Sequence, residues 1–259
     1  MRWEHIRVAA TDGLATITMN RPERRNALSE AHMQELIAAL RSSADDDETR
    51  AIMIAAAGPV FSAGHDFADM AERDLDGMRR LLAVCAELMR TIQRVRVPVV
   101  ASVQGVATAA GCQLVASCDL AVASESASFA TPGGRGGWFC TTPMVAVARA
   151  VGRKRALELL FTGEPIDAQT ALAWGLVNRV VPADRLVPAS EELARLASRG
   201  SRTSKELGKR AFYDTIDLDV DAAYAIACEV MASSAVTDDG REMMRAFLEK
   251  RPGIYPSRR

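Results

Sequence analysis

The sequence predicts one α/β domain followed by a helical C-terminal region. Three features of the 259-residue chain support this fold class. Short apolar strands recur through its first half, helical patterns separate them, and residues 200–259 carry helical patterns without a convincing strand. Strands that alternate with helices through short connections form right-handed crossovers and a parallel sheet. We therefore expect a core in residues 1–199 and a helical extension in residues 200–259.

The N-terminal elements follow from hydrophobic periodicity. Two strands, Ile6–Ala10 and Leu14–Met19, flank a turn that ends at Gly13. Ser29 then caps a helix whose apolar side chains share one face. That face consists of Met33, Leu36, Ile37 and Leu40. The next segment, Ala51–Ala57, is apolar on both faces, which is typical of a strand buried in a parallel sheet.

The alternation of strand and helix continues along the middle of the chain. Asp76 begins a second amphipathic helix, and Val99–Val103 follows it as another buried strand. A turn at Gly105 leads to a short helix from about Ala110 and then to a strand at Leu120–Ala123. Further along, the pattern becomes mostly helical. These later helical stretches include Arg153–Phe161, Ala168–Trp174 and Leu186–Ala197.

The composition is that of a soluble globular protein, with 49% hydrophobic and 25% charged residues. A formal net charge of -1 lacks the basic excess that nucleic-acid-binding proteins usually show. The N-terminus, Met1–His5, is too polar for a secretory signal peptide, and no run of apolar residues is long enough for a transmembrane helix. We therefore expect a cytoplasmic protein that binds neither nucleic acid nor membrane.

Several common kinds of site are absent from the sequence. The 5 cysteines are an odd number without a C-x-x-C pair, which is typical of reduced thiols rather than a disulfide framework. The 3 histidines are scattered, and none has a second ligand at metal-binding spacing, so we expect no metal site. The chain contains neither a P-loop motif nor a G-x-S-x-G elbow. Its glycine-rich run, Gly133–Gly137, does not complete a dinucleotide-binding motif.

Three segments carry the strongest functional signal. They are Asn20–Leu28, Phe61–Asp66 and Gly105–Leu120. At this order and spacing they resemble the enoyl-CoA hydratase/isomerase family, also called crotonases. Residues 148–152, 160–163 and 171–177 extend the resemblance over nearly the whole chain. The resemblance implies a spiral of ββα repeats, a coenzyme A (CoA) thioester as substrate or ligand, no permanently bound cofactor, and assembly into homotrimers or hexamers.

The second and third segments also have a physical interpretation. Each is a small glycine-containing turn after a strand, which lets a ligand approach backbone N–H groups closely. The third turn opens a helix, whose N-terminus favours negative charge. Two converging N–H groups would form an oxyanion hole for a thioester carbonyl. The resemblance assigns the donors to the N–H groups of His65 and Ala110. A simple tight turn and a close helix–strand contact are the structural alternatives.

The resemblance further places CoA along two of these segments. The residues concerned are Arg24, Asn26, Ala27 and Leu28 in the first, and Ala63, Gly64 and Asp66 in the second. The helical extension is expected to complete the CoA site and to form the oligomer interface. Lysines near the phosphates would come from Lys205, Lys209 or Lys250, unless these side chains belong to a solvated surface.

Both catalytic glutamates of the family are replaced in this chain. In the hydratases one glutamate activates water for attack at Cβ, and the pair handles the proton at Cα. The corresponding residues here are Gln113 and Gly133. A glutamine can orient water but cannot accept its proton at ordinary pH, and glycine does neither. Because general acid–base catalysis contributes about 10²–10⁴-fold, we do not expect ordinary hydratase activity.

Two other side chains are candidates for chemistry. Cys140 lies where dehalogenase-like relatives carry a nucleophilic carboxylate, and a thiolate there would be a competent nucleophile. The alternative is a small buried apolar side chain. The His65 imidazole is a candidate acid or base, unless only its backbone is used.

Three hypotheses for the function follow from these residues. The first is a hydratase or isomerase assisted by water bound to Gln113. The second is thioester hydrolysis or decarboxylation, with Cys140 as the reactive group. The third is a non-catalytic acyl-CoA-binding protein.

Overall fold

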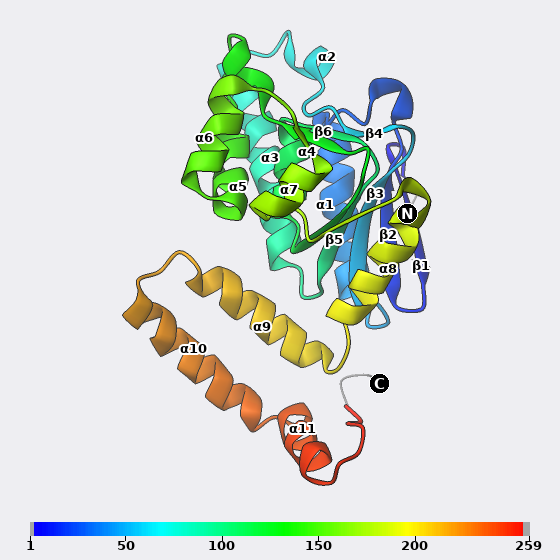
Figure 1. Cartoon of the computed structure of the whole chain (residues 1–259), viewed down its shortest axis with the longest axis vertical. Coiled ribbons are helices and arrows are strands. Elements are labelled where there is room, and N and C mark those ends of the chain that lie inside the picture. The colour runs from blue at the N-terminus through cyan, green and yellow to red at the C-terminus, as the bar shows by residue number, and fades with distance from the viewer. Residues whose placement is uncertain (1–2, 256–259) are drawn as a thin grey trace.

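Two β-sheets form the centre of the protein in the computed structural model, which describes residues 3–255 (Figure 1). The larger sheet contains, in spatial order, β1 (Ile6–Thr11), β2 (Leu14–Met19), β3 (Ala51–Ala56), β5 (Val99–Val103), β7 (Leu120–Ser124) and β10 (Arg179–Val181). The smaller sheet contains β4 (Val60–Ser62), β6 (Val106–Thr108), β8 (Ser128–Ala130) and β9 (Ile166–Asp167). From β2 to β10 the larger sheet is parallel, and only the β1–β2 hairpin is antiparallel.

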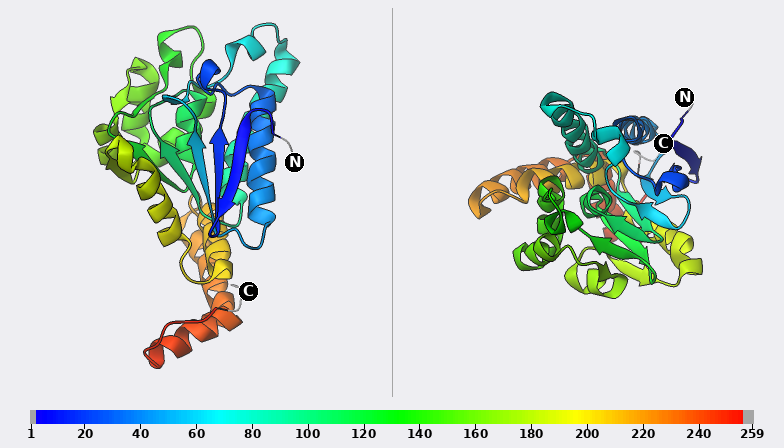
Figure 2. Two further views of the ribbon diagram at one scale, coloured as in Figure 1. Left: turned by 90° about the vertical axis from the view of Figure 1, so that its right-hand side faces the viewer. Right: turned by 90° about the horizontal axis from the view of Figure 1, so that it is seen from above.

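Helices cover both faces of the larger sheet. The helices of the core are α1 (Glu30–Asp45), α2 (Phe67–Met70), α3 (Leu75–Arg94), α4 (Ala110–Ser117), α5 (Thr141–Val151), α6 (Arg153–Thr162), α7 (Ala168–Trp174) and α8 (Leu186–Ala197). In Figure 2 (left), α1 lies on one side of the sheet and α8 on the other. Alternate residues of β3 divide between these faces, because Ile52 and Ile54 join the main core whereas Ala51 and Met53 pack with Ala194 of α8.

Local sequence signals account for the main elements. The Ser29 hydroxyl accepts a hydrogen bond from the His32 N–H and caps α1. All residues of β5 are buried, as expected for a strand covered on both faces. The predicted α/β fold and its helical C-terminal region are confirmed. Several predicted boundaries differ by one residue. Helix α3, for example, begins at Leu75 and is capped by the Asp74 carboxylate rather than starting at Asp76.

The chain order builds the predicted spiral of ββα repeats. Strands β3 and β4 precede α2 and α3, strands β5 and β6 precede α4, and strands β7 and β8 precede α5. The first strand of each repeat joins the larger sheet and the second joins the smaller sheet. Strand β6 lies between β4 and β8 and is parallel to both. The carboxyl ends of the three strands therefore lie at one edge of the smaller sheet. The turns that follow these three strands are therefore brought together.

The C-terminal helices extend away from this body. They are α9 (Arg202–Thr215), α10 (Val220–Ala235) and α11 (Asp238–Leu248), and Figure 1 shows α9 and α10 side by side below the sheets. No residue of α10 is buried. Among the described residues no single helix is long and apolar enough to span a membrane, although α10 and α11 together pass that test across a 72° bend. The division of the chain at residue 199 remains a prediction, and its outer limits at 1 and 259 lie outside the described residues.

Polar contacts of one buried lysine attach α9 to the core. The Lys209 ammonium donates to the Asp119 carboxylate at 2.6 Å and to the carbonyls of Ile92 and Val97 at 2.8 and 3.0 Å. The Tyr213 hydroxyl donates to the other oxygen of Asp119 at 2.8 Å. Burial lowers the pKa of Lys209 and raises that of Asp119, while each charge opposes the shift of the other. The Lys209 ammonium is thus engaged in contacts that hold α9 on the core, and its predicted place near the CoA phosphates stays a prediction.

Candidate functional site

Three turns at the carboxyl edge of the smaller sheet surround a cavity of about 500 Å³. Ala63 and His65 come from the turn after β4, and Thr108–Ala110 from the end of β6 and the turn after it. The segment after β8 contributes Pro132, Gly133 and Gly136–Cys140, and the start of α5 contributes Thr141–Pro143. Helices α2 and α3 contribute Phe67 and Leu82. The structure therefore brings the second and third sequence segments together, as the parallel arrangement of the short strands requires.

The two predicted N–H donors occupy neighbouring turns. A methyl group placed on Gly64 would lie 2.9 Å from the Ala109 side chain and 3.3 Å from the Ala110 nitrogen. Gly64 also has φ +88, a conformation that favours glycine. Within residues 3–255, neither the His65 N–H nor the Ala110 N–H donates a hydrogen bond to the protein. Both donors therefore remain available to a ligand.

A strained residue precedes the second donor. Ala109 has φ 51 and ψ -117 at the start of α4, a combination that is sparsely populated by residues with a side chain. Its N–H donates to the Ala130 carbonyl at 2.9 Å, which ties the turn to β8. Strain held by surrounding structure is found frequently at functional sites. Here the strained residue and the first residue of α4, Ala110, both line the cavity.

Replacing this residue with glycine should relieve the strain. We expect Ala109→Gly to raise the free energy of unfolding by about 1 kcal/mol, since strain relief exceeds the added entropy of the unfolded chain. Denaturant titration measures this difference in the free energy of unfolding, provided that the free energy falls with denaturant concentration at the same slope in both proteins. Ala110→Gly is the matched control, because Ala110 is helical and buried, and it should destabilise by about 1 kcal/mol. A destabilised Ala109→Gly variant would contradict the strain assignment.

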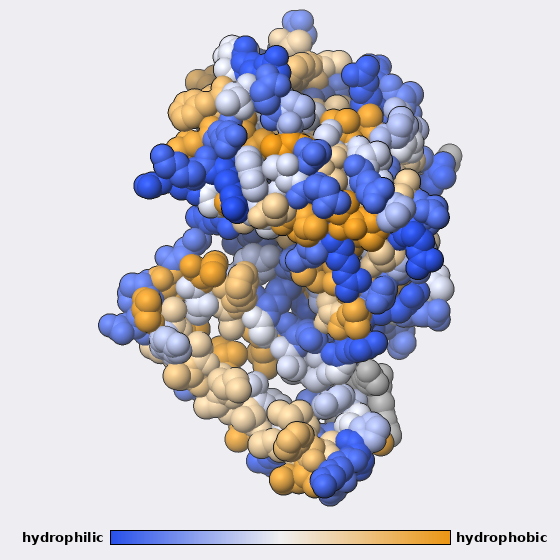
Figure 3. Space-filling view, in the orientation of Figure 1, coloured by the Kyte–Doolittle hydropathy of each residue, from blue (hydrophilic) through white to orange (hydrophobic). Residues whose placement is uncertain are grey.

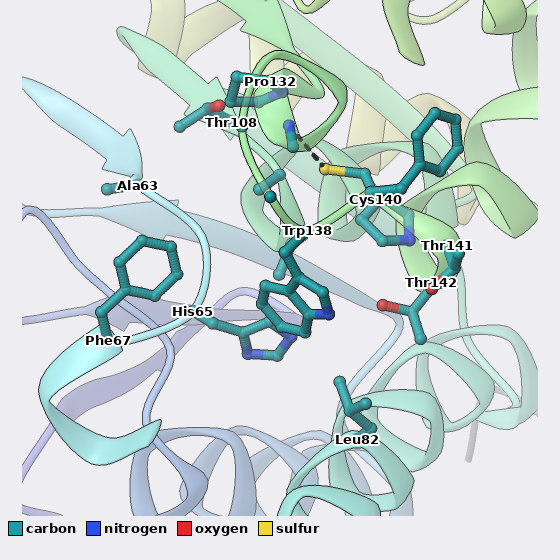
Figure 4. A pocket seen from close by; sticks show the side chains of 17 residues that line it. Ala63, His65, Phe67, Leu82, Thr108, Pro132, Trp138, Cys140, Thr141 and Thr142 are labelled. Atoms are coloured by element: carbon teal, nitrogen blue, oxygen red, sulfur yellow. Dashed lines mark hydrogen bonds between the residues drawn. The ribbon is translucent and has the colours of Figure 1, made fainter. Parts of the chain in front are cut away.

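The cavity is largely apolar. Figure 4 shows Phe67, Trp138 and Leu82 among the side chains that line it, together with Pro132 and Thr108. Its polar side-chain groups are the hydroxyls of Thr108, Thr141 and Thr142, the Cys140 thiol, the His65 imidazole and the indole N–H of Trp138. No aspartate, glutamate, lysine or arginine is present among the described lining residues.

Both ring nitrogens of the half-buried His65 are inaccessible to solvent, and neither has a hydrogen-bond partner within residues 3–255. Its ring lies beside the indole of Trp138, with centroids 6.3 Å apart. Burial lowers the pKa of His65, and the nearby Leu28 carbonyl partly opposes this shift without reaching hydrogen-bonding geometry. The ring is therefore neutral at pH 7.

Cys140 lies in the cavity wall at the N-terminus of α5. Its Sγ accepts a hydrogen bond from the Gly133 N–H at 3.4 Å. Burial raises the pKa of the Cys140 thiol, and the Gly133 N–H opposes that rise. The thiol form therefore predominates, and nucleophilic chemistry by Cys140 stays an untested hypothesis.

The two positions where the resemblance predicts that glutamates are replaced differ in their surroundings. Gln113 lies on α4, is 4% exposed, and accepts a hydrogen bond from the Cys85 thiol of α3 at 3.7 Å. It is not among the cavity-lining residues. Gly133 lines the cavity, but a methyl group on it would lie 2.1 Å from the Trp138 carbonyl oxygen and 2.8 Å from Cys140 Sγ. The loop therefore has no room for a longer side chain at position 133.

This lack of room predicts a contrast between two glycines of the same loop. Gly133→Ala should lower the free energy of unfolding by about 2–3 kcal/mol, because the added methyl group meets backbone. Gly137→Ala should change it by less than about 0.5 kcal/mol, since nothing lies within 4 Å of that position. Thermal or denaturant unfolding of the two variants provides the comparison. Equal stability of both would show that the loop is not packed as described.

The residues predicted to bind CoA form one connected unit. Leu28 donates to the Gly64 carbonyl at 2.7 Å, and the Asp66 N–H donates to the Leu28 carbonyl at 3.2 Å. These bonds place residues 24–28 beside residues 63–66. Arg24 is exposed there, Ala27 and Leu28 are buried, and Ala63 is the member that also lines the cavity.

Two of these side chains have structural partners. The Asn26 amide donates to the carbonyls of Ala57 and Val60, both at 2.8 Å, and its oxygen accepts from the Arg21 N–H. The Asp66 carboxylate pairs with the Arg21 guanidinium at 3.2 Å and caps α2. The Asn26 and Asp66 side chains thus hold residues 24–28 and 63–66 in place. A ligand at this unit would contact backbone groups and exposed neighbouring side chains.

Sequence reasoning did not identify the apolar wall of the cavity. Phe67, Leu82 and Trp138 line it, yet Phe67 and Trp138 are 71% and 44% exposed. A large aromatic residue directly after a Gly-Gly pair, as at Trp138, was the available signal. Of the other predicted lysines, Lys250 is exposed, and Lys205 lines a separate hollow between the C-terminal helices.

Comparison with known proteins identifies close relatives of this chain. The enoyl-CoA hydratase/isomerase family model matches residues 9–258. The mouse protein "Enoyl-CoA hydratase domain-containing protein 3, mitochondrial" is 45% identical over 94% of this chain and 82% of its own length. The crystal structure of human enoyl-CoA hydratase domain-containing protein 3 superposes with a TM-score of 0.93 at 44% identity, covering 97% of this chain and 100% of that one. The crystal structure of an enoyl-CoA hydratase from Mycobacterium smegmatis superposes with a TM-score of 0.94 at 43% identity, covering 97% of this chain and 98% of that one.

These relatives correct one prediction. The chain was expected to be cytoplasmic, whereas the similar mouse, rat and human proteins are named as mitochondrial. The cytoplasmic prediction is therefore wrong. Its basis was unpaired cysteines and a polar N-terminus, and reduced thiols do not distinguish one reducing compartment from another.

Proposed function

The chain belongs to the enoyl-CoA hydratase/isomerase family, and we propose that it binds acyl-CoA thioesters and polarises their carbonyl group without hydrating them efficiently. The observation that carries this proposal is the pair of uncommitted N–H groups, from His65 and Ala110, in adjoining turns beside an apolar cavity. Preorganised N–H donors stabilise negative charge that develops on a carbonyl oxygen. The cavity of about 500 Å³ would accept the acyl chain.

The same cavity supports the second half of the proposal. Hydration needs a group that takes a proton from water and returns one to Cα. No carboxylate lines the cavity among residues 3–255, the Gln113 amide is directed to Cys85, and position 133 is closed to larger side chains. Only the oxyanion hole would then act on the thioester. One missing acid–base group lowers the rate by about 10²–10⁴-fold. Hydration is therefore expected to be much slower here than in a protein that carries the two glutamates.

Binding of the CoA portion would use the unit formed by residues 24–28 and 63–66. Arg24 presents an exposed guanidinium beside this unit, suited to a phosphate or pyrophosphate group. Gly64 lets a ligand come close to the backbone of its turn. No permanently bound cofactor is required for this function, since the thioester is itself the ligand.

Assembly into a homotrimer, or a hexamer of two trimers, is part of the proposal. Crotonase-family proteins typically oligomerise, and α9–α11 expose a large apolar surface in the isolated chain. Figure 3 shows apolar residues along these helices. The large exposed apolar side chains of α9–α11 and their connections are Phe212, Ile216, Leu218, Val220, Tyr224, Ile226, Met231, Val236, Met243, Met244, Phe247 and Leu248. A surface of this kind marks a protein–protein contact rather than a solvated face.

Mixing near-stoichiometric protein with crotonyl-CoA tests the two halves of the proposal separately. Calorimetry should detect saturable binding, whereas loss of the enoyl absorbance should be far slower than an ordinary enzyme turnover of about 1–10³ s⁻¹. Turnover in that range would contradict the argument from missing carboxylates. Absence of binding to crotonyl-CoA and to longer enoyl-CoA thioesters would contradict the oxyanion-hole assignment.

A further inference from the structure

The Ala27 carbonyl is held by two side chains that do not line the cavity. It accepts a hydrogen bond from Arg21 Nη1 at 3.1 Å and a second from His32 Nδ1 at 3.1 Å. Burial lowers the pKa of His32 to about 4, so the ring is neutral at pH 7 and its Nδ1 carries the proton that it donates. The Arg21 guanidinium is positively charged. One charged and one neutral donor therefore fix the direction of this carbonyl.

The peptide group between Ala27 and Leu28 continues toward the candidate site. It is trans, so the Leu28 N–H points opposite to the Ala27 carbonyl. That N–H donates to the Gly64 carbonyl at 2.7 Å. The peptide group between Gly64 and His65 is also trans, so the His65 N–H points away from Leu28. This last N–H has no acceptor within residues 3–255, and it ends the line of hydrogen bonds.

The backbone of Arg21 and the tip of its side chain are both fixed. Its N–H donates to Asn26 Oδ1 at 2.9 Å, and its carbonyl accepts from the N–H groups of Arg24 and Asn26. At the other end, Nη2 pairs with the Asp66 carboxylate at 3.2 Å, and Nη1 also donates to the Ser29 hydroxyl at 3.2 Å. The Arg21 side chain is 16% exposed. Its charge therefore stands at a defined place beside the Ala27 carbonyl.

A line of hydrogen-bonded peptide groups transmits polarisation. A hydrogen bond from a charged donor is roughly twice as strong as one between neutral groups. A peptide group that accepts such a bond becomes a better donor at its own N–H, by about 10–30% per bond. From Arg21 to the His65 N–H the line crosses two peptide groups. The Asp66 carboxylate offsets part of the guanidinium charge, but it does not compete for the Ala27 carbonyl, because both groups are acceptors.

We propose that Arg21 is a positioning residue for the candidate oxyanion hole. Its guanidinium orients and polarises the two peptide groups that end at the His65 N–H, and this makes that N–H a stronger donor to a thioester carbonyl. His32 assists as the second donor to the Ala27 carbonyl. This inference rests on the proposed binding and polarisation of acyl-CoA thioesters, and the test separates its failure from the failure of that function.

The test records the absorbance of cinnamoyl-CoA bound to the whole protein at saturation, so that a change in affinity does not alter the spectrum. Hydrogen bonds to the thioester carbonyl shift this absorbance to longer wavelength. Arg21→Met keeps the length of the side chain but removes the charge and every donor, and it should lose about 10–30% of the red shift. Arg21→Lys keeps the charge and should recover part of that loss.

Arg73→Met is the matched control for the loss of a shielded arginine. The Arg73 side chain is 20% exposed and pairs with Glu30 and Asp69 in the same region, but it does not donate to the Ala27 carbonyl. This variant should lose stability in thermal unfolding and keep the full red shift. A merely structural role of Arg21 would give the two arginine variants the same spectrum.

A pair of His32 variants tests the same carbonyl independently and decides the question if Arg21→Met does not fold. His32→Asn offers an amide N–H at the distance from the backbone at which Nδ1 lies, and it should keep the red shift. His32→Leu removes the donor and should lower the red shift.

Three results would overturn the inference. A full red shift in both Arg21→Met and His32→Leu would overturn it while leaving the proposed function intact. An equal loss of red shift in Arg73→Met would assign the effect to general loosening around α2. If the unmodified protein binds cinnamoyl-CoA without a red shift, or does not bind it, the proposed function fails and this inference fails with it.

Discussion

Gly64→Ala is expected to abolish polarisation of a bound thioester and to lower the free energy of unfolding by about 1–3 kcal/mol. The added methyl group would lie 2.9 Å from both the Ala109 side chain and the Thr108 carbonyl oxygen. The turns after β4 and β6 must then separate, and the N–H groups of His65 and Ala110 separate with them. Removal of a single oxyanion donor typically costs about 10²–10³-fold in rate. The loss is measured as the disappearance of the shift in thioester absorbance on binding.

Gly200→Ala is the matched control for this substitution. Gly200 has φ +86, close to the φ +88 of Gly64, but nothing lies within 4 Å of its missing side chain. It therefore carries the backbone strain of an alanine at positive φ without the contact between the two turns. Both variants should lose stability, and only Gly64→Ala should lose thioester polarisation. Polarisation that persists in Gly64→Ala would contradict the assignment of the two donors.

Lys209→Met is expected to destabilise the folded protein by about 3–5 kcal/mol. The substitution leaves the Asp119 carboxylate buried without its cation, and it leaves the carbonyls of Ile92 and Val97 without a donor. Breaking a buried ion pair by removing one partner is typically this costly. This pair and Tyr213 hold α9 to the core together with Arg202, whose guanidinium donates to the carbonyls of Asp46 and Asp47. Loss of the pair should therefore loosen the C-terminal helices. Urea unfolding measures the loss, and limited proteolysis within α9–α11 reports the detachment.

The pH dependence of this variant provides a second measurement. Burial raises the pKa of Asp119, and removal of Lys209 raises it further. The folded form then retains a proton that the unfolded chain has released, so stability falls as pH rises from the ordinary aspartate pKa of about 3.9 through the raised value. The deficit of Lys209→Met should therefore be larger at pH 8 than at pH 5. Tyr213→Phe, which keeps the ion pair, should cost only about 1 kcal/mol. A Lys209→Met variant as stable as the original chain would show that the pair does not anchor α9.

Periodicity in the sequence was sufficient to predict most of the long elements. Val99–Val103, Ala168–Trp174 and Leu186–Ala197 have the same bounds in the structure as in the prediction. Each is a continuous apolar run or an amphipathic pattern with a clear stop. By contrast, β4 and β6 contain 3 residues each, too few to show a period. These short strands nevertheless bring together the turns that contain Gly64 and Ala110.

The sequence predicted the turns of the candidate site but not the directions of its side chains. The turns containing Gly64 and Ala110 were recognisable from their small residues and from the resemblance to a family. The direction of the Gln113 side chain was not, because it depends on Cys85, which is 28 positions away in the sequence. The closure of position 133 by Trp138 and Cys140 likewise depends on how one loop folds back on itself. Side-chain direction and loop packing are tertiary properties, and local patterns do not encode them.

Absorbance titration with cinnamoyl-CoA tests the central claim most directly. The conjugated thioester absorbs at longer wavelength when hydrogen bonds draw electron density onto its carbonyl oxygen. We predict saturable binding with a red-shifted absorbance that is lost in Gly64→Ala and retained in Gly200→Ala. Binding with an unshifted spectrum would contradict the claim that the N–H groups of His65 and Ala110 form an oxyanion hole.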